Sequence, residues 1–349
     1  MNTIEKRIVE VSSVLLLIVA GQANAQGVQQ GGVSIQGVAT QTVGTGAVTT
    51  GAGNIGAGVA RTKIGAINNS AVGGDLAQTV GAGVVITRSQ GALTSAATNI
   101  GVIEDTSAQG HITQTTVTGA VGTSAVGVGA GASTSIGTME GATLAAEAFQ
   151  LTTTFGANNA AMGAGAAAKL GVGQIKDSSV KGEINQRTNV VGVLNNQAIA
   201  AGGIASTEIG VMKNSSVQGS VNQTTTVIGA VSTMAVGVGT VGVTEIGKVN
   251  NTEVSGSLDQ STTVLGIVAT TAGGAGALAC TSIGTIGQSE CGLQAVDEVV
   301  DEVIQDGVDS IVAPSAPTIA RPNPVAGRPA GISIPQSRVA PTVSIPARR

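Results

Sequence analysis

The chain has 349 residues and a formal net charge of -4, with 53 glycines, 10% charged residues, no Trp or Tyr, two Phe and one His. So few large or ionisable side chains argue against an enzyme or a cofactor site, and the acidic balance argues against nucleic-acid binding, which needs a basic stripe. Hydrophobic residues still make up 42%, so the chain is not of the low-hydrophobicity disordered class, and we expect a core packed with small side chains.

Residues 1–25 have the three parts of a secretory signal peptide. Lys6 and Arg7 precede an apolar run over 14–20, and Ala23-Asn24-Ala25 forms a small-residue cleavage site. A short buried helix is the alternative. No later stretch reaches the roughly 18 uninterrupted apolar residues of a membrane span. We therefore expect an exported protein whose mature chain begins near Gln26.

Residues 26–292 are predicted to form about seven copies of one repeat. A glutamine recurs every 36 or 37 residues, at Gln41, Gln78, Gln114, Gln150, Gln186, Gln223 and Gln260. A small residue stands four positions before each glutamine, and an Ile-Gly or Val-Gly pair keeps the same step elsewhere in each copy. Two marks with one fixed period indicate a repeat architecture.

Within each copy, apolar residues alternate with polar ones. The segment 217–227 has Val, Gly, Val, Gln, Thr and Val at every second position, the pattern of a strand with one buried face. The second half of each copy is rich in Gly, Ala and Val, as in 229–243, which favours corners and closely approaching strands. The predicted fold is all-β, with each copy forming one multi-strand rung of a β-solenoid or of an amyloid-like stack.

The glutamine column lies on the apolar face of this pattern. A singly buried amide leaves donors and acceptors unpaired, at a cost of about 1 to 3 kcal/mol, whereas identical amides stacked rung on rung bond one another. An internal glutamine ladder is therefore predicted. The alternative is that the glutamines mark a polar edge or corner of the solenoid.

Some features of the repeat region depart from its pattern. The fourth copy has Ala146 in the small-residue column, together with Phe149 and Phe155, and is expected to contain a bulge or a flexible interruption. Glu208 and Glu245 each precede an Ile-Gly pair and are expected to face solvent at a corner. The carboxylates form no recurrent pair, and the Gly-x-Gly-x-x-Gly match at 237–242 is expected by chance at this glycine content.

Cys280 and Cys291 are the only cysteines. In an exported protein such a pair is readily oxidised, so they are a candidate disulfide at the end of the stack. Free or metal-binding thiols are the alternative, but zinc sites need three or four Cys or His ligands and the one histidine, His111, is far away in sequence. We expect no metal site and no catalytic constellation.

Two further segments follow the repeats. In residues 293–312, apolar positions recur at steps of three to five among Asp and Glu, which predicts an acidic amphipathic helix that either caps the stack or lies on its surface. Residues 313–349 contain all of the proline and five arginines but no acidic residue, which predicts an extended disordered tail, serving as a binding segment or a spacer.

The signal peptide, the repeats of about 37 residues with regularly placed Gln and Asn, the Gly-Ala-rich spacers and the lack of aromatic residues together resemble the bacterial functional-amyloid subunits of the Fap type, and more distantly those of the curli type. The resemblance implies an exported subunit that polymerises into cell-surface or biofilm fibres. It implies ladder positions at Gln41, Gln78, Gln114, Gln186, Gln223 and Gln260. It also implies self-association as the main partnership, with secretion or nucleator proteins and cell-surface components as further partners.

Two classes of function remain open at this point. The first is a structural subunit that adds rung upon rung and gives adhesion or matrix strength. The second is a monomeric β-solenoid, either a surface adhesin or an ice-binding protein with a regular threonine array. An ice-binding face needs threonine in register, but the position of Thr224 is Ser261 in the next copy and Arg187 in the previous one. The first class is therefore favoured.

Overall fold

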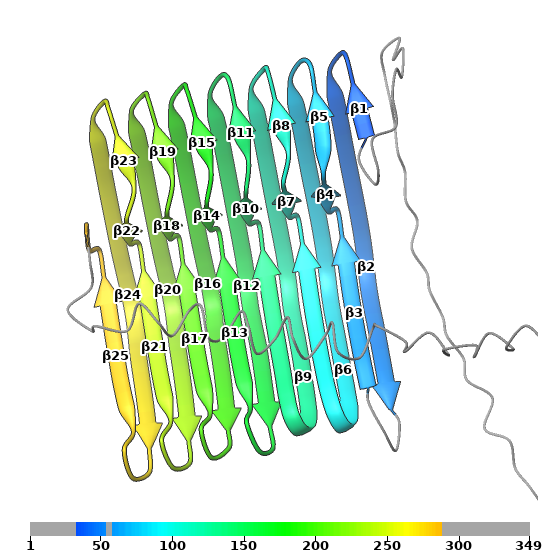
Figure 1. The fold of residues 1–349 in the computed structure, drawn as a ribbon, viewed down its shortest axis with the longest axis vertical. Helices are drawn as coiled ribbons and strands as arrows, with labels where there is room; N and C mark the ends of the chain where they lie inside the picture. The colour runs from blue at the N-terminus through cyan, green and yellow to red at the C-terminus, as the bar shows by residue number, and fades with distance from the viewer. Residues whose placement is uncertain (1–32, 54–57, 288–349) are drawn as a thin grey trace, which may run out of the picture. The chain divides into compact units, whose positions relative to one another are not determined.

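A computed structural model describes residues 33–53 and 58–287. Throughout these residues the regular elements are β-strands, paired in parallel and stacked as a β-solenoid of seven rungs (Figure 1). The predicted all-β stacked repeat is therefore confirmed. The predicted signal peptide, acidic helix and tail lie outside the described residues.

Each rung follows the same path, which the sixth rung illustrates. The long arm β20 (Val221–Val236) runs to a tight tip, and the return arm β21 (Val241–Ile246) comes back beside it. Two short strands follow, β22 (Val249–Asn250) and β23 (Glu253–Val254), before the chain enters the next long arm. Four strands joined by tight turns thus fold the extended repeat into one layer.

The remaining strands repeat this path. The other long arms are β2 (Ala39–Gly53), β12 (Ala148–Met162), β16 (Ile184–Ile199) and β24 (Leu258–Gly273), and the other return arms are β3 (Gly58–Ile64), β13 (Ala167–Val172), β17 (Ile204–Ile209) and β25 (Leu278–Ile283). In the second and third rungs, β6 (Leu76–Ile100) and β9 (Ile112–Ile136) each contain both arms and the tip.

The short strands form two further sheets. One contains β4 (Ile67–Asn68), β7 (Ile103–Glu104), β10 (Met139–Glu140), β14 (Ile175–Lys176), β18 (Met212–Lys213) and β22. The other contains β1 (Val33–Ile35), β5 (Ser70–Val72), β8 (Ser107–Ala108), β11 (Thr143–Leu144), β15 (Ser179–Val180), β19 (Ser216–Val217) and β23. Strand residues therefore pair with their equivalents one repeat away, as Gln186 does with Gln223.

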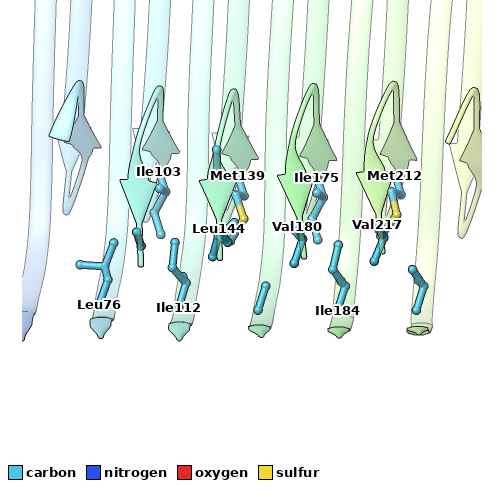
Figure 2. Close-up of a cluster of buried hydrophobic side chains, with 14 of the residues drawn as sticks. Leu76, Ile103, Ile112, Met139, Leu144, Ile175, Val180, Ile184, Met212 and Val217 are labelled. Atoms are coloured by element: carbon cyan, nitrogen blue, oxygen red, sulfur yellow. The ribbon is translucent and has the colours of Figure 1, made fainter. Parts of the chain in front are cut away.

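The core changes in character along the rung. Ile, Leu, Met and Val fill the space between the short strands and the start of the long arms, where Leu76, Ile112 and Ile184 recur rung by rung (Figure 2). Val, Ile and Leu fill the middle between the two arms, and the buried apolar side chains towards the tips are alanines. Stacking of small and medium side chains thus supplies the core of a chain almost without aromatic residues.

The glycine of each Ile-Gly mark has a steric role. Gly173 has a φ of +59°, and a Cβ at that position would lie 2.1 Å from Thr188 Oγ1. The equivalent glycines of the other rungs have φ values between +56° and +62°. Because an L side chain is disfavoured at such a φ and would clash here, only glycine suits this corner.

A second corner uses short polar residues in the left-handed conformation. Asn69, Asp105, Asp177, Asn214 and Asn251 have φ values of 46–50°. In each case the next residue is Ser or Thr, and its hydroxyl donates to the carbonyl two positions before it at 2.7–3.0 Å. Asn and Asp tolerate this conformation better than other non-glycine residues, so the corner needs no glycine.

The fourth copy is a regular rung, not an interruption. Its long arm β12 is continuous and pairs with β9 without a shift, whereas its register with β16 shifts between Thr154 and Gly156, so the bulge expected in the fourth copy lies on β16 in the fifth. The shift arises because β16 contains one more residue than β12, at Val191 and Gly192. The same extra residue recurs in β20 and β24, which explains the change of period from 36 to 37 residues.

Candidate functional site

The seven glutamines form one column that runs through the stack. Each Nε2 from Gln78 to Gln260 donates to Oε1 of the glutamine one rung before it, at 2.8–3.0 Å. Each of these Nε2 atoms also donates to the carbonyl of the Ile-Gly or Val-Gly corner thirteen residues earlier, as Gln186 does to Gly173 at 2.6 Å. The five glutamines from Gln78 to Gln223 are fully buried.

This arrangement uses both hydrogens of each amide. One bonds to the glutamine of the preceding rung, and the other bonds to the corner that ends the return arm of that same preceding rung. Neither hydrogen is left unpaired in a region closed to water, which avoids the desolvation cost of a buried amide. The column therefore joins the start of each long arm to the rung before it at two points, which fixes the register between rungs.

Threonine hydroxyls form a second buried ladder, which the sequence analysis did not identify. The hydroxyls alternate between long and return arms at O···O distances of 2.6–2.8 Å. The participants are Thr50, Thr62, Thr87, Thr98, Thr123, Thr134, Thr207, Thr233, Thr244, Thr270 and Thr281. The recurrence of a threonine at one place in each arm is the signal that could have revealed them.

The threonine ladder is interrupted once, and two asparagines bridge the interruption. Leu170 occupies the return-arm position that pairs with Thr134 and Thr207. Thr134 donates instead to Asn159 on the long arm at 3.4 Å, and Asn159 Nδ2 donates to Asn196 Oδ1 at 2.9 Å. Asn196 Nδ2 then donates to Thr207 at 3.1 Å, so the side-chain bonds continue past the leucine.

Charged residues form a third ladder at the corner after the return arm. Glu208 accepts contacts from Lys176 and Lys213, both at 2.7 Å, and Lys213 also lies 2.8 Å from Glu245. Lys248 lies 2.5 Å from the other oxygen of Glu245. Glu208 and Glu245 are buried, so the expectation that they face solvent is wrong.

The reason is the chain's path at this corner. Glu208 and Ile209 are consecutive and both buried, because the lysine that follows the turn covers the side of the return arm opposite the main core. Alternation predicts only one buried face for a strand, and here the return arm has two.

The ionisation of Glu208 follows from this environment. Burial alone raises the pKa of a carboxyl group, but the positive charges of Lys176 and Lys213 outweigh it and hold the pKa of Glu208 well below its usual range. Glu208 is therefore a carboxylate at neutral pH, and it accepts a further hydrogen bond from Gln174.

Neutral groups close the charged ladder at its C-terminal end. Ser282 pairs with Glu245 in the register of the strands, and its hydroxyl bonds to that of Thr285 at 2.7 Å. The buried charges thus end in the sixth rung, one rung before the last described rung of the stack.

The glutamine and threonine columns, unlike the charged one, reach the last described rung. There Ile283 is 43% exposed, whereas Ile246, its equivalent in the sixth rung, is 0% exposed. Gln260, Val264 and Val268 are only partly buried, whereas their sixth-rung equivalents are fully buried. The last described rung therefore presents the same inward columns as the others, and residues 33–53 and 58–287 contain no further rung that covers them.

Residues 33–53 and 58–287 contain no group of three or more His, Cys, Asp or Glu side chains able to hold a metal ion. His111 is exposed, and its Nδ1 lies 3.8 Å from Glu147. The same residues contain no helix long and apolar enough to cross a membrane.

Of the candidate disulfide, only one half lies in the described part of the chain. Cys280 is on β25 and is not a free thiol. Cys291 lies outside the described residues, so its pairing with Cys280 stays a prediction.

Comparisons with known proteins add no relative: no family model, no curated protein and no solved structure matches the chain.

Proposed function

We propose that the protein is an exported structural subunit that self-assembles, end to end, into cell-surface or biofilm-matrix fibres that mediate adhesion. The observation that carries the proposal is the open last rung, in which Ile283, Gln260 and Val268 occupy columns that are closed in every interior rung. A strand edge with unpaired backbone groups and half-covered apolar columns is a template for another strand. The first rung of a second copy has the same residue columns as this last rung, so it is a matching partner for it.

The two ends of the stack are complementary in their hydrogen bonds. Each glutamine from Gln78 to Gln260 donates to the one before it, so the column has a direction. Within the described residues, Nε2 of Gln41 at one end and Oε1 of Gln260 at the other have no glutamine partner. Stacking the first rung of one copy on the last rung of another would bring this donor to this acceptor.

The first and last rungs also have matching apolar columns. Val48 and Val268 belong to one inward column, which the long arms continue through every rung. Thr50 and Thr270 belong to one threonine column. The charged ladder ends before the last rung, so no buried charge would need a partner at the junction.

The alternative is a monomeric solenoid that binds a surface or ice. An ice-binding reading needs a regular outward threonine array, and the outward column through Thr224 contains Thr42, Thr79, Thr115, Leu151, Arg187, Thr224 and Ser261. Leu151 and Arg187 interrupt it in the middle of the stack, which favours the structural role.

Seeded assembly of the chain from Gln26 onward tests the proposal. We expect growth without a lag on addition of preformed filaments, and fibre diffraction with a meridional spacing of about 4.7 to 4.8 Å, the spacing of stacked strands. A monomer of constant mass at every concentration would contradict the proposal and favour the adhesin or ice-binding alternative.

A further inference from the structure

Exposed apolar side chains gather on the outer face of the long arms in the fourth to seventh rungs. Six of them, which we call the outer patch, lie where the long arms bend: Phe155, Val191, Val193, Ile228, Leu265 and Ile267. Val191, Ile228 and Leu265 are direct neighbours on adjacent strands, and Val193 and Ile267 flank Ala230 in the next column. Leu265 is 60% and Ile267 69% exposed.

This face lacks the charges that usually protect an exposed sheet. The four long arms β12, β16, β20 and β24 contain two charged residues, Arg187 and Asp259. Sheet surfaces that stay in water are normally protected by lysine and other charged residues, and a contiguous apolar surface marks an interaction site.

The extra residue of the longer repeats enlarges the patch. In β12 one large side chain, Phe155, points outward at the bend, between the buried Thr154 and Ala157. In β16 the inserted residue leaves both Val191 and Val193 exposed, between the buried Val190 and Leu194. The same insertion in β24 exposes both Leu265 and Ile267. The insertion thus adds outward apolar side chains without adding to the core.

The chemistry of the patch favours a second copy of this chain as its occupant. Its side chains repeat from strand to strand at the spacing of the rungs. The outer face of a second copy has the same spacing, so the side chains of the two faces can interdigitate along their whole length. A lipid surface is disfavoured, since Arg187 is the one basic residue on these four arms, and anionic membranes are usually bound through several.

We propose that the outer patch is a lateral interface at which two copies pack face to face through their long arms. Side chains of two sheets then interdigitate about 10 Å apart, as in other stacked sheets. The interface is separate from the open last rung, so it does not rest on end-to-end assembly. In filaments it joins two stacks side by side, and without filaments it forms a dimer.

Photo-cross-linking in the chain from Gln26 onward tests which surface meets the patch. An Ile228→p-benzoylphenylalanine variant is mixed as equal parts of ¹⁴N- and ¹⁵N-labelled protein, so that cross-links between chains carry both labels. Thr79→p-benzoylphenylalanine is the matched control, because Thr79 is also exposed on the outer face of a long arm but lies outside the patch. We expect mixed-label cross-links from position 228 to peptides of residues 148–273, and at least tenfold fewer from position 79.

A charge variant provides the second measurement. Ile228→Lys is expected to halve the mass of the assembled species, from two stacks to one in filaments or from dimer to monomer, whereas Thr79→Lys is expected to leave it unchanged. Filaments that persist at half the mass per length would keep the end-to-end proposal and support this one. Cross-links from 228 only within its own chain, or an unchanged mass in Ile228→Lys, would overturn the lateral interface while leaving end-to-end assembly intact.

Discussion

Glu208 Oε1 and Lys213 Nζ, five residues apart in the chain, lie 2.7 Å apart at a corner of the stack that is closed to solvent. Lys176 approaches the other oxygen of the same carboxylate from the rung before. One carboxylate thus joins two rungs, and Lys213 in turn joins Glu208 to Glu245. The charged ladder is therefore a connection between rungs as well as within them.

Removing the Glu208 carboxylate should lower the free energy of unfolding. Glu208→Gln leaves Lys176 and Lys213 buried with less negative charge around them, and loss of one partner of a buried pair typically costs about 3 to 5 kcal/mol. We expect the urea midpoint of unfolding to fall accordingly. Glu253→Gln, at an exposed carboxylate on β23, is the matched control and is expected to change the free energy of unfolding by less than about 0.5 kcal/mol. Equal effects of the two variants would contradict a stabilising role for the ladder.

The pH dependence of stability has a defined sign. The pKa of Glu208 is lowered by folding, so the unfolded state binds its proton more tightly, and stability falls as the pH decreases below the unfolded value of about 4.3. We expect an unchanged contribution between pH 7 and about 5, with loss below. Urea titrations at several pH values should show a shallower acid decline in Glu208→Gln than in the parent chain. Stability that rises as the pH falls from 7 towards 5, and that no longer does so in the variant, would mean a raised pKa instead.

Substitution of a glutamine in the column should lower the free energy of unfolding most in the interior of the stack. Gln186→Ala removes the bond to Gln150 and leaves Gln223 without its acceptor, so we expect a loss of about 1 to 3 kcal/mol in the free energy of unfolding. Gln260→Ala removes one bond along the column at a partly exposed end and should cost less. Asn222→Ala, outward on the same arm as Gln223, controls for loss of an amide outside the column. Thermal or chemical unfolding at low concentration measures all three.

Because Asn159 and Asn196 bridge the interruption of the threonine ladder at Leu170, we expect positions 159 and 170 to be energetically coupled. Asn159→Thr shortens the side chain that reaches Asn196, and is expected to destabilise the fold by about 1 to 3 kcal/mol. Adding Leu170→Thr restores the hydroxyl found in the other return arms and should recover part of the loss, giving a coupling energy above about 0.5 kcal/mol in a double-mutant cycle. Strict additivity would show that the asparagines are not a replacement for the missing threonine.

Much of this architecture is readable from the sequence, because a strict period places equivalent residues over one another. The glutamine column and the Ile-Gly corner each appear once per copy, so their stacking follows from the period alone. The threonine and charged ladders are harder to predict, because their members come from different arms. Thr98 and Thr123 meet across 25 residues, and Glu208 meets lysines on both of its sides. The positions of such contacts depend on where each arm turns.

Complementary end variants test end-to-end assembly most directly. Val268→Lys places a charge on the open inward column of the last rung, and Val48→Lys places one on the same column of the first rung. With both variants made in the Ile228→Lys background, which removes the lateral interface, each variant alone should stay monomeric, because one of the two surfaces of every junction is blocked. An equimolar mixture, whose members each retain the end that the other needs, is expected to form a 1:1 pair and no polymer, as measured by sedimentation. Polymerisation of either variant alone, or a mixture that stays monomeric while the parent chain polymerises, would contradict the account.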